Sequence, residues 1–306
     1  MTSVCPTLEG LHKGGKLMMA YSLAEIETHP DSEDVLSLLE ESWEQPLGHV
    51  IGVTGPPGVG KSTLLNVLIN RWRAEGKTVG VIAVDPSSQR TGGALLGDRT
   101  RLSVDPADEA VFVRSMAARD RLGGLAALTY PASVVMRAAY DILIVETVGV
   151  GQSETEISKI ADTVVFCVQP GSGDSLQYMK AGVMEVPHLA VITKADMGQN
   201  AIRARADVKG ALSLSREDGE EAVPVLLVSS NSGDGIDDLT AAIDDRWAAI
   251  GDSEGLLRHR QQAGLYWLEE VIREEFGKKG YDRVAASLDA GRSPFGQWRD
   301  ILAEND

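Results

Sequence analysis

The sequence has few cysteines, few cationic side chains and no long apolar run. Its two cysteines, Cys5 and Cys167, do not make a disulfide framework. No apolar run approaches about 18 residues and the N-terminus lacks a signal-peptide pattern, so we expect a soluble, cytoplasmic protein. Lys and Arg total 29 against 45 Asp and Glu, which gives a formal charge of −16. Because such a surface repels phosphate backbones and anionic lipids, binding to nucleic acids or membranes is not expected.

Two common kinds of reactive centre are also missing from the sequence. The histidines are scattered, and no cluster of Cys and His has the spacing of a metal site, so each histidine is expected to be packed or solvated. No nucleophile stands with a base in the manner of a serine or cysteine hydrolase. Cys167 lies in an apolar strand pattern and is expected to be a buried thiol. The five histidines are His12, His29, His49, His188 and His259.

The strongest motif is a glycine-rich segment between a strand pattern and a helix pattern. Residues 55–62 read Gly-x-x-x-x-Gly-Lys-Ser. A loop that wraps a phosphate points several backbone N–H groups inward, which requires glycines, and the following helix adds the positive end of its dipole. Lys61 would reach the outer phosphates and the Ser62 hydroxyl would ligate magnesium. The sequence therefore predicts a nucleotide-binding protein. The loop glycines expected in this role are Gly55, Gly58 and Gly60.

Strand and helix patterns alternate from residue 49 to about residue 250. The apolar strand runs are continuous rather than alternating, as expected of strands that are covered on both faces. Repeated βα units predict an α/β fold with a mostly parallel, doubly wound sheet of the P-loop nucleotidase type, whose ligands bind at the carboxyl ends of the strands. Strands are predicted at 50–53, 78–84, 110–113, 141–145, 163–168, 189–193 and 223–228, and helices notably at 121–139 and 155–160.

Helical segments are predicted on both sides of this domain. Two helix patterns before residue 49, separated by a turn at His29–Ser32, are expected to form a small extension packed on the nucleotide domain. A long helix pattern from Leu256 to Phe276 is followed by one or two shorter ones. A terminal arm of this kind either docks a second subunit or packs on its own domain, and both readings stay open. The predicted domains are therefore 1–48, 49–250 and 251–306.

Two acidic side chains end predicted strands next to the phosphate loop. Asp85 ends the second strand, where a carboxylate either holds magnesium or its water shell beside Ser62, or caps the following turn. Glu146 ends the strand at 141–145, where phosphate-loop enzymes place an acid that contacts metal-bound water. Gly149 follows at a spacing that lets its N–H meet a γ-phosphate. Because such a loop orders with the triphosphate and relaxes after hydrolysis, a switch is predicted.

The segment Thr193-Lys194-Ala195-Asp196 predicts the base. Asp196 would accept hydrogen bonds from guanine N1–H and the 2-amino group, neither of which adenine offers. At ~1.5–3 kcal/mol for each charge-assisted bond, this residue separates the two bases by a few kcal/mol. The Lys194 stem is expected to cover the base, and Ser229 and Ser230, after the last strand, to close the pocket through backbone groups. GTP is therefore the predicted nucleotide.

Taken together, the motifs resemble those of the MeaB/ArgK family of GTPases over about residues 8–276. The resemblance implies a magnesium-dependent GTPase that is a chaperone of an adenosylcobalamin-dependent acyl-CoA mutase such as methylmalonyl-CoA mutase, gating cofactor loading and protecting the mutase. It also implies a homodimer built through the C-terminal arm. The motifs that carry it are Gly-Val-Thr-Gly-Pro-Pro-Gly-Val-Gly-Lys-Ser-Thr, Val-Ile-Ala-Val-Asp-Pro-Ser-Ser, Leu-Gly-Asp-Arg-Thr-Arg-Leu (96–102), Glu-Thr-Val-Gly-Val-Gly-Gln-Ser-Glu and Lys-Ala-Asp.

The resemblance also implies roles for individual residues. The loop at 169–180 resembles a mobile family loop that communicates with the mutase, with an ordinary βα loop as the alternative. The implied catalytic residues are Lys61, Asp85, Asp98, Arg101, Glu146 and Gly149. The implied metal ligands are Ser62, Asp85, Asp98 and Glu146. The implied nucleotide-binding residues are Gly55, Gly58, Val59, Gly60, Lys61, Ser62, Thr63, Thr193, Lys194, Asp196, Ser229 and Ser230.

The sequence departs from the family pattern at Thr193, where Asn is usual. This change removes an amide that would contact the base. Two alternative functions share the phosphate loop. A nickel-insertion GTPase of the hydrogenase or urease type generally carries a Cys/His metal site, which this sequence lacks. An ATP-dependent kinase is disfavoured by Asp196.

Overall fold

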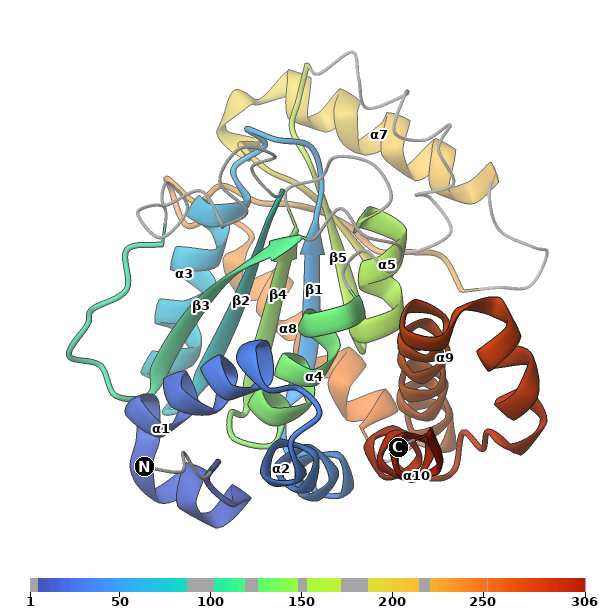
Figure 1. The fold of residues 1–306 in the computed structure, drawn as a ribbon. Helices are drawn as coiled ribbons and strands as arrows, with labels where there is room; N and C mark the ends of the chain where they lie inside the picture. The colour runs from blue at the N-terminus through green and yellow to red at the C-terminus, as the bar shows by residue number, and fades with distance from the viewer. Residues whose placement is uncertain are drawn as a thin grey trace.

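The computed structural model describes residues 5–86, 102–118, 126–147, 153–171, 187–214, 221–251 and 253–305. Between β1 and α8 the strands are interspersed with helices, although no described helix separates β2 from β3 or β5 from β6, and further helices lie before and after this part (Figure 1). The strands are β1 (His49–Thr54), β2 (Val79–Pro86), β3 (Val111–Ala118), β4 (Ile142–Thr147), β5 (Thr163–Val168), β6 (Leu189–Ile192) and β7 (Val225–Leu227). The helices are α1 (Leu8–Thr28), α2 (Glu33–Glu44), α3 (Lys61–Ala74), α4 (Ala126–Arg137), α5 (Ser153–Ile160), α7 (Gln199–Leu214), α8 (Ile236–Ile250), α9 (Glu254–Val284) and α10 (Pro294–Asn305), with short 3-10 turns η2 (Ala195–Met197) and η3 (Ala285–Ser287).

The strands form one parallel sheet in the order β3-β2-β4-β1-β5-β6-β7. The chain adds strands on one side of β1 first and later on the other, so the direction of winding reverses at β1. Ligands of open α/β sheets bind at such a switch point, outside the carboxyl ends of the strands. The glycine-rich loop follows β1 directly, so the topology places the predicted phosphate site at the switch point.

Both faces of the sheet are covered, which explains the continuous apolar strand patterns. Alternate residues of a strand point to opposite faces. Ile51 and Ile144 pack in the cluster formed with α3 and α8, whereas Val50 and Leu143 pack in the cluster that includes α4. Every residue of β1 is buried. The doubly wound sheet predicted from the sequence is confirmed, including all seven predicted strands.

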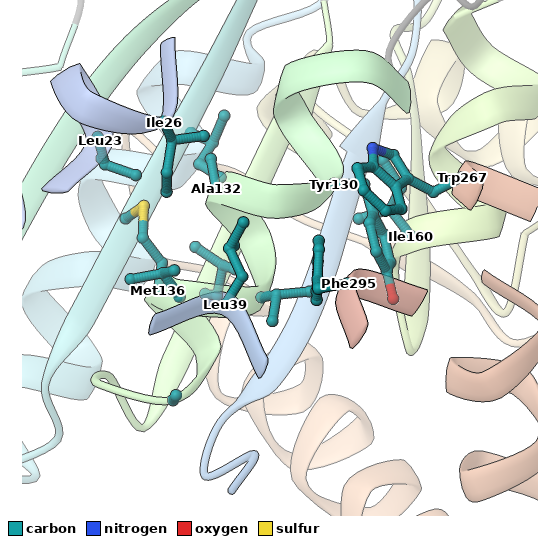
Figure 2. Packing of buried hydrophobic residues seen from close by; sticks show 14 of the residues in the cluster. Leu23, Ile26, Leu39, Tyr130, Ala132, Met136, Ile160, Trp267 and Phe295 are labelled. Carbon is teal, nitrogen blue, oxygen red and sulfur yellow. The ribbon is translucent and has the colours of Figure 1, made fainter. Parts of the chain in front are cut away.

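The helices at the two ends of the chain share one hydrophobic cluster with α4. Figure 2 shows Ile26 of α1 and Leu39 of α2 on one side of α4, with Phe295 of α10 and Trp267 of α9 near Tyr130. The rings of Trp267 and Phe295 lie 4.7 Å apart between centroids, and those of Tyr130 and Trp267 lie 5.9 Å apart. The N-terminal extension therefore packs on the nucleotide domain, as predicted.

The C-terminal tail also contacts the N-terminal extension directly. Trp298 Nε1 in α10 donates a 2.7 Å hydrogen bond to Asp31, and Arg299 donates a 2.9 Å hydrogen bond to Glu40 of α2. Burial of Phe295 and Trp298 at this contact adds apolar area to the two polar links. The C-terminal arm therefore packs on its own chain, and docking of a second subunit stays a prediction.

A buried ion pair fastens α9 to the amino-terminal edge of the sheet. Arg260 donates to both carboxylate oxygens of Asp162, at 3.0 and 2.7 Å, and to the Gly48 carbonyl oxygen at 2.9 Å. Asp162 also accepts from the Val50 N–H at 2.8 Å. The Asp162 side chain is completely inaccessible to solvent. Burial alone would raise the pKa of Asp162, but the hydrogen bonds and charge of Arg260 outweigh it and hold this pKa below its usual value.

His49 lies beside this ion pair as a packed histidine. Its ring stacks on Trp247 at 4.5 Å between centroids. His49 Nε2 lies 2.8 Å from the Thr163 hydroxyl, which also accepts from Arg246 at 3.1 Å. Burial lowers the pKa of His49 to about 4. His49 is therefore neutral near pH 7 and structural, in agreement with the prediction for the histidines.

Several local features agree with the predictions from the sequence. Ser32 caps α2 through its side chain, as the predicted turn requires. Cys167 is fully buried, and burial raises its pKa to about 12. The helix predicted from Leu256 to Phe276 is present, and Gly277, whose backbone is not helical, separates it from a shorter helical segment that ends at Val284. The helix predicted at 121–139 is described only from residue 126 and ends at 137. None of the helices in the described ranges is both long and apolar enough to span a bilayer.

Candidate nucleotide site

The loop after β1 has the backbone that its glycines predict. Its three glycines have positive φ values, which other residues rarely adopt: 141° at Gly55, 76° at Gly58 and 97° at Gly60. At Gly55 a Cβ atom would lie 2.2 Å from the Cys167 carbonyl oxygen of β5, so the loop and the strand fit closely only without a side chain. Gly60 is the N-cap of α3, and the exposed N–H groups of the first turn therefore face the loop.

The Lys61 ammonium group is held by its own loop. Its Nζ donates to the carbonyl oxygens of Gly55 at 2.6 Å and Pro56 at 3.1 Å, and the residue is 6% exposed. Two hydrogen bonds within the loop therefore hold this cation in place. Thr63, the second residue after Lys61, is exposed in the first turn of α3.

Ser62 and Glu146, which are 84 residues apart in sequence, lie in contact. The Ser62 hydroxyl donates a 3.1 Å hydrogen bond to Glu146 Oε1, which comes from the end of β4. The neighbouring strand ends are joined by a 3.0 Å hydrogen bond from the Thr147 hydroxyl to that of Thr54. Because β1 and β4 are adjacent, the phosphate loop and the strand-end acid meet at one edge of the sheet.

The predicted base-binding carboxylate is held in place by a serine from the next strand end. The Ser229 hydroxyl donates a 2.8 Å hydrogen bond to Asp196 Oδ1, and its oxygen accepts from the Ser232 N–H at 3.3 Å. Ser229 is fully buried, whereas Asp196 is exposed. Ser230 follows in the same turn. One carboxylate oxygen is therefore occupied within the protein, and the group remains accessible to a ligand.

The base side and the phosphate side are also linked directly. The buried Thr193 hydroxyl lies 2.6 Å from the Val59 carbonyl oxygen of the phosphate loop and 3.1 Å from that of Val168. The next residue, Lys194, donates to the Gly58 carbonyl at 3.3 Å and to Gln169 at 2.5 Å. Lys194 has φ of 54°, an uncommon left-handed backbone for a residue other than glycine. Sequence reasoning missed these links because the motif identifies the residues but not their partners.

Several predicted residues cannot be placed. Asp98, Arg101 and Gly149 lie outside the described residues, as does the side chain of Asp85, and of the loop 169–180 only the first three residues are described. Among the described residues, no group of three or more His, Cys, Asp or Glu side chains has the arrangement of a metal site. The site residues that the structure brings together are the phosphate loop, Glu146, and the two segments around Asp196 and Ser229.

The family described as methylmalonyl-CoA mutase-associated GTPase MeaB matches residues 17–284 of the chain. The chain belongs to the MeaB family. A putative GTPase of Pyrococcus horikoshii is 40% identical over 94% of this chain and 90% of its own length. The GTPase ArgK of Escherichia coli is 37% identical, over 92% and 88%. The mouse mitochondrial methylmalonic aciduria type A homolog is 34% identical, over 87% and 68%.

Solved structures share the fold of this chain. The crystal structure of a LAO/AO transport system kinase matches with a TM-score of 0.66 and 28% identity, over 97% of this chain and 95% of that one. HypB from Helicobacter pylori, solved with nickel, matches with a TM-score of 0.51 and 18% identity, over 77% and 98%, which shows a shared fold alone. The family, the P-loop fold and the GTPase activity predicted from the motifs are therefore confirmed.

Proposed function

We propose that this MeaB-family GTPase uses magnesium to hydrolyse GTP, and that its nucleotide state controls an adenosylcobalamin-dependent acyl-CoA mutase. The observation that carries the first part is the contact between Ser62 and Glu146. It places a hydroxyl and a carboxylate at the carboxyl edge of the sheet, next to a loop whose backbone is built for phosphate. Phosphoryl transfer needs little more from a protein than positioning and electrostatic stabilisation.

The residues present fit a magnesium ion. Magnesium prefers hard oxygen ligands and takes one or two from the protein, with water and phosphate oxygens completing the shell. Ser62 and Glu146 supply oxygen atoms of this kind within 3.1 Å of each other. Asp85 and Asp98 are the further acids that the family resemblance assigns. When bound, magnesium would neutralise charge that develops on the phosphate oxygens.

Phosphate binding is expected to redirect Lys61. Its ammonium group now donates to two neutral carbonyl oxygens of its own loop. The bonds to the carbonyl oxygens are charged on the donor side alone, whereas a γ-phosphate oxygen also carries negative charge and attracts the ammonium group, so the phosphate is the better acceptor. We infer that Lys61 moves from the carbonyls of Gly55 and Pro56 to the phosphate when GTP binds.

Guanine would be read by Asp196. The bond from Ser229 fixes the rotation of the carboxylate before a ligand arrives. A fixed carboxylate loses less conformational entropy on binding than a free one, so more of each hydrogen-bond energy appears as affinity. The N1–H and 2-amino groups of guanine match this acceptor, whereas adenine offers neither.

The mutase is proposed as partner from the family. The family description names a methylmalonyl-CoA mutase-associated GTPase, and the match covers residues 17–284. The mouse relative is named for methylmalonic aciduria. The nickel-bound neighbour is 18% identical and supports only the fold, so nickel insertion is the weaker proposal.

A homodimer is a further proposal from the resemblance. The described part of α9 contacts α4 and α5, and α10 contacts α2 of the same chain. A dimer would therefore use surfaces that these contacts leave exposed, such as the part of α9 around Leu257, which is 57% exposed. Sedimentation equilibrium of the parent and of Leu257→Glu tests this: the dimer should weaken in the variant, and a monomeric parent would contradict it.

The experiment that tests the proposed function is a titration of GTP turnover with a purified acyl-CoA mutase. Turnover should rise as mutase is added and should be abolished by Lys61→Ala, while Lys13→Ala, a change to an exposed lysine in α1, should behave as the parent. By linkage, a partner that binds the GTP form more tightly must raise GTP affinity by the same factor.

The two halves of the proposal fail separately. If Lys61→Ala hydrolyses GTP at the parent rate, the phosphate-loop assignment is wrong. If the mutase leaves turnover unchanged and binds equally to the GDP form and to the form with a non-hydrolysable GTP analogue, the partner is wrong, because equal affinity for both states shifts nothing.

A further inference from the structure

The side chain of Thr193 is buried against the phosphate loop. The residue is 4% exposed, and its hydroxyl lies 2.6 Å from the Val59 carbonyl oxygen and 3.1 Å from the Val168 carbonyl oxygen. The Val168 oxygen already accepts the backbone N–H of Thr193 at 2.8 Å. The shorter hydroxyl contact is therefore the one to Val59, between the two left-handed glycines of the loop.

A threonine hydroxyl has only one proton to donate. That proton lies against protein carbonyl oxygens, so none remains for the acceptors of a purine, which on guanine are N7 and O6. An asparagine amide at this position would have two protons and would be able to serve a carbonyl and a base together. Thr193 is able to serve only one of them.

We propose that Thr193 is a positioning residue that tethers the phosphate loop to the base-binding segment and takes no part in reading the base. Base discrimination then rests on Asp196 and its partner Ser229. This inference depends on nucleotide binding at the proposed site. It assigns separate roles to two residues of one segment: Thr193 affects the affinity for every nucleotide, and Asp196 determines which base is preferred.

The tether acts by restricting the free loop. Without it, the loop visits conformations that do not cradle phosphate, and the apparent affinity falls by the fraction of molecules that remain competent. Lys194 supports the adjacent carbonyl of Gly58, so the loop keeps a second link when the hydroxyl is removed. A neutral hydrogen bond contributes about 1 kcal/mol, which corresponds to a loss of roughly fivefold in affinity rather than to abolition.

The test compares GDP and its analogues on four proteins by isothermal titration calorimetry. The ligands are GDP, 7-deaza-GDP, which lacks the N7 acceptor, and 6-thio-GDP, which has a weak acceptor at position 6. The proteins are the parent, Thr193→Val, which removes the hydroxyl at nearly constant shape, Thr193→Ser, which keeps it, and Ser229→Ala. Thr193→Val should weaken all three ligands by the same factor of about five, and Thr193→Ser should restore parent affinity.

Ser229→Ala provides the contrasting control. It should reduce the preference for GDP over inosine diphosphate, which lacks the 2-amino group, whereas Thr193→Val should leave that preference unchanged. Loss of affinity for GDP that is not shared by 7-deaza-GDP or 6-thio-GDP would show that the hydroxyl contacts the base and would overturn the proposal. Parent affinity in Thr193→Val would overturn it equally.

Further measurements distinguish failure of the tether proposal from failure of the proposed function and from misfolding of a variant. If the parent binds no guanine nucleotide, the proposed function fails, whatever Thr193 does. If Thr193→Val does not fold, Thr193→Cys replaces it, because a thiol is a weak donor in a side chain of similar size. Hydrogen exchange at residues 58–60 of the nucleotide-free protein should be faster in either variant than in Thr193→Ser, and equal exchange would contradict a tether.

Discussion

The hydroxyl of Ser62, in the first turn of α3, donates a 3.1 Å hydrogen bond to Oε1 of Glu146 at the end of β4. This contact joins the phosphate loop to a strand-end acid through the sheet, because β1 and β4 are paired in register from His49 with Ile142 to Val53 with Glu146. The strand pairing therefore fixes the position of Glu146, and the glycine-rich loop and the first turn of α3 bring Ser62 to it.

Replacement of Glu146 by Gln should remove charge but keep an acceptor for Ser62. We expect GTP turnover to fall about 100-fold, as when an electrostatic contributor to a transition state is lost, and the magnesium concentration needed for half-maximal rate to rise. Steady-state turnover over a magnesium series measures both. Glu44→Gln, at an exposed position at the end of α2, is the control and should match the parent. Unchanged turnover and magnesium dependence in Glu146→Gln would remove this residue from the site.

Asp196→Asn should change which base is preferred. The amide turns an acceptor oxygen into a donor, so guanine loses a charge-assisted bond, while xanthine gains a partner for its carbonyl at position 2. At ~1.5–3 kcal/mol for such a bond, GTP affinity should fall about tenfold to 100-fold relative to XTP. Competition binding of the two nucleotides checks this. The guanine assignment does not survive if their relative affinity stays the same.

The strands and the phosphate loop were predictable because their patterns are local. The run Val50–Val53 is buried on both faces, and the glycines at 55, 58 and 60 need a left-handed or otherwise unusual backbone whatever surrounds them. The acid at Glu146 was also predictable, since it ends a strand beside β1. A local pattern predicts the conformation of a segment and the edge of the sheet at which that segment ends.

The partners of individual side chains were not predictable. The hydroxyl of Thr193 contacts the carbonyl oxygen of Val59, which is 134 residues away in the sequence. Arg260 pairs with Asp162 although the sequence predicts that its helix belongs to a separate arm. Such contacts depend on how helices dock on the sheet, which a single sequence does not encode in its periodicity. The same is true of Trp298 and Asp31, which join the two ends of the chain.

Arg260→Met should destabilise the fold strongly. It removes both hydrogen bonds to Asp162 and leaves a carboxylate that is completely inaccessible to solvent without its cation. Breaking a buried pair in this way costs about 3–5 kcal/mol. Arg258→Met, on the same helix, removes an arginine that is 72% exposed and should cost little. Urea unfolding of both variants measures the difference, and similar midpoints for the two would show that the buried pair does not hold α9.

The last prediction concerns the dependence of stability on pH. Burial, together with the charges of the neighbouring Arg260 and Arg246 and against the opposing charge of Asp162, lowers the pKa of His49 to about 4. In the unfolded chain the pKa of a histidine is about 6.5. Between these two values the unfolded chain binds a proton that the folded protein does not, so the free energy of unfolding should fall as the pH falls from about 6.5 toward 4. From pH 7 to pH 5 the loss from this residue should be roughly 2 kcal/mol.

Urea unfolding at pH 7 and pH 5 tests the effect with a matched pair of variants. His49→Gln removes the titrating ring and should be less stable than the parent at pH 7, because stacking on Trp247 is lost, yet it should lose less stability on acidification. Asn70→Gln, an exposed change that removes no titrating group, should keep the slope of the parent. Asp162 does not contribute in this window: its pKa is held below the usual value by Arg260, so its stabilising effect is lost only as the pH falls below about 4. A slope in His49→Gln equal to that of the parent would mean that another group binds the proton.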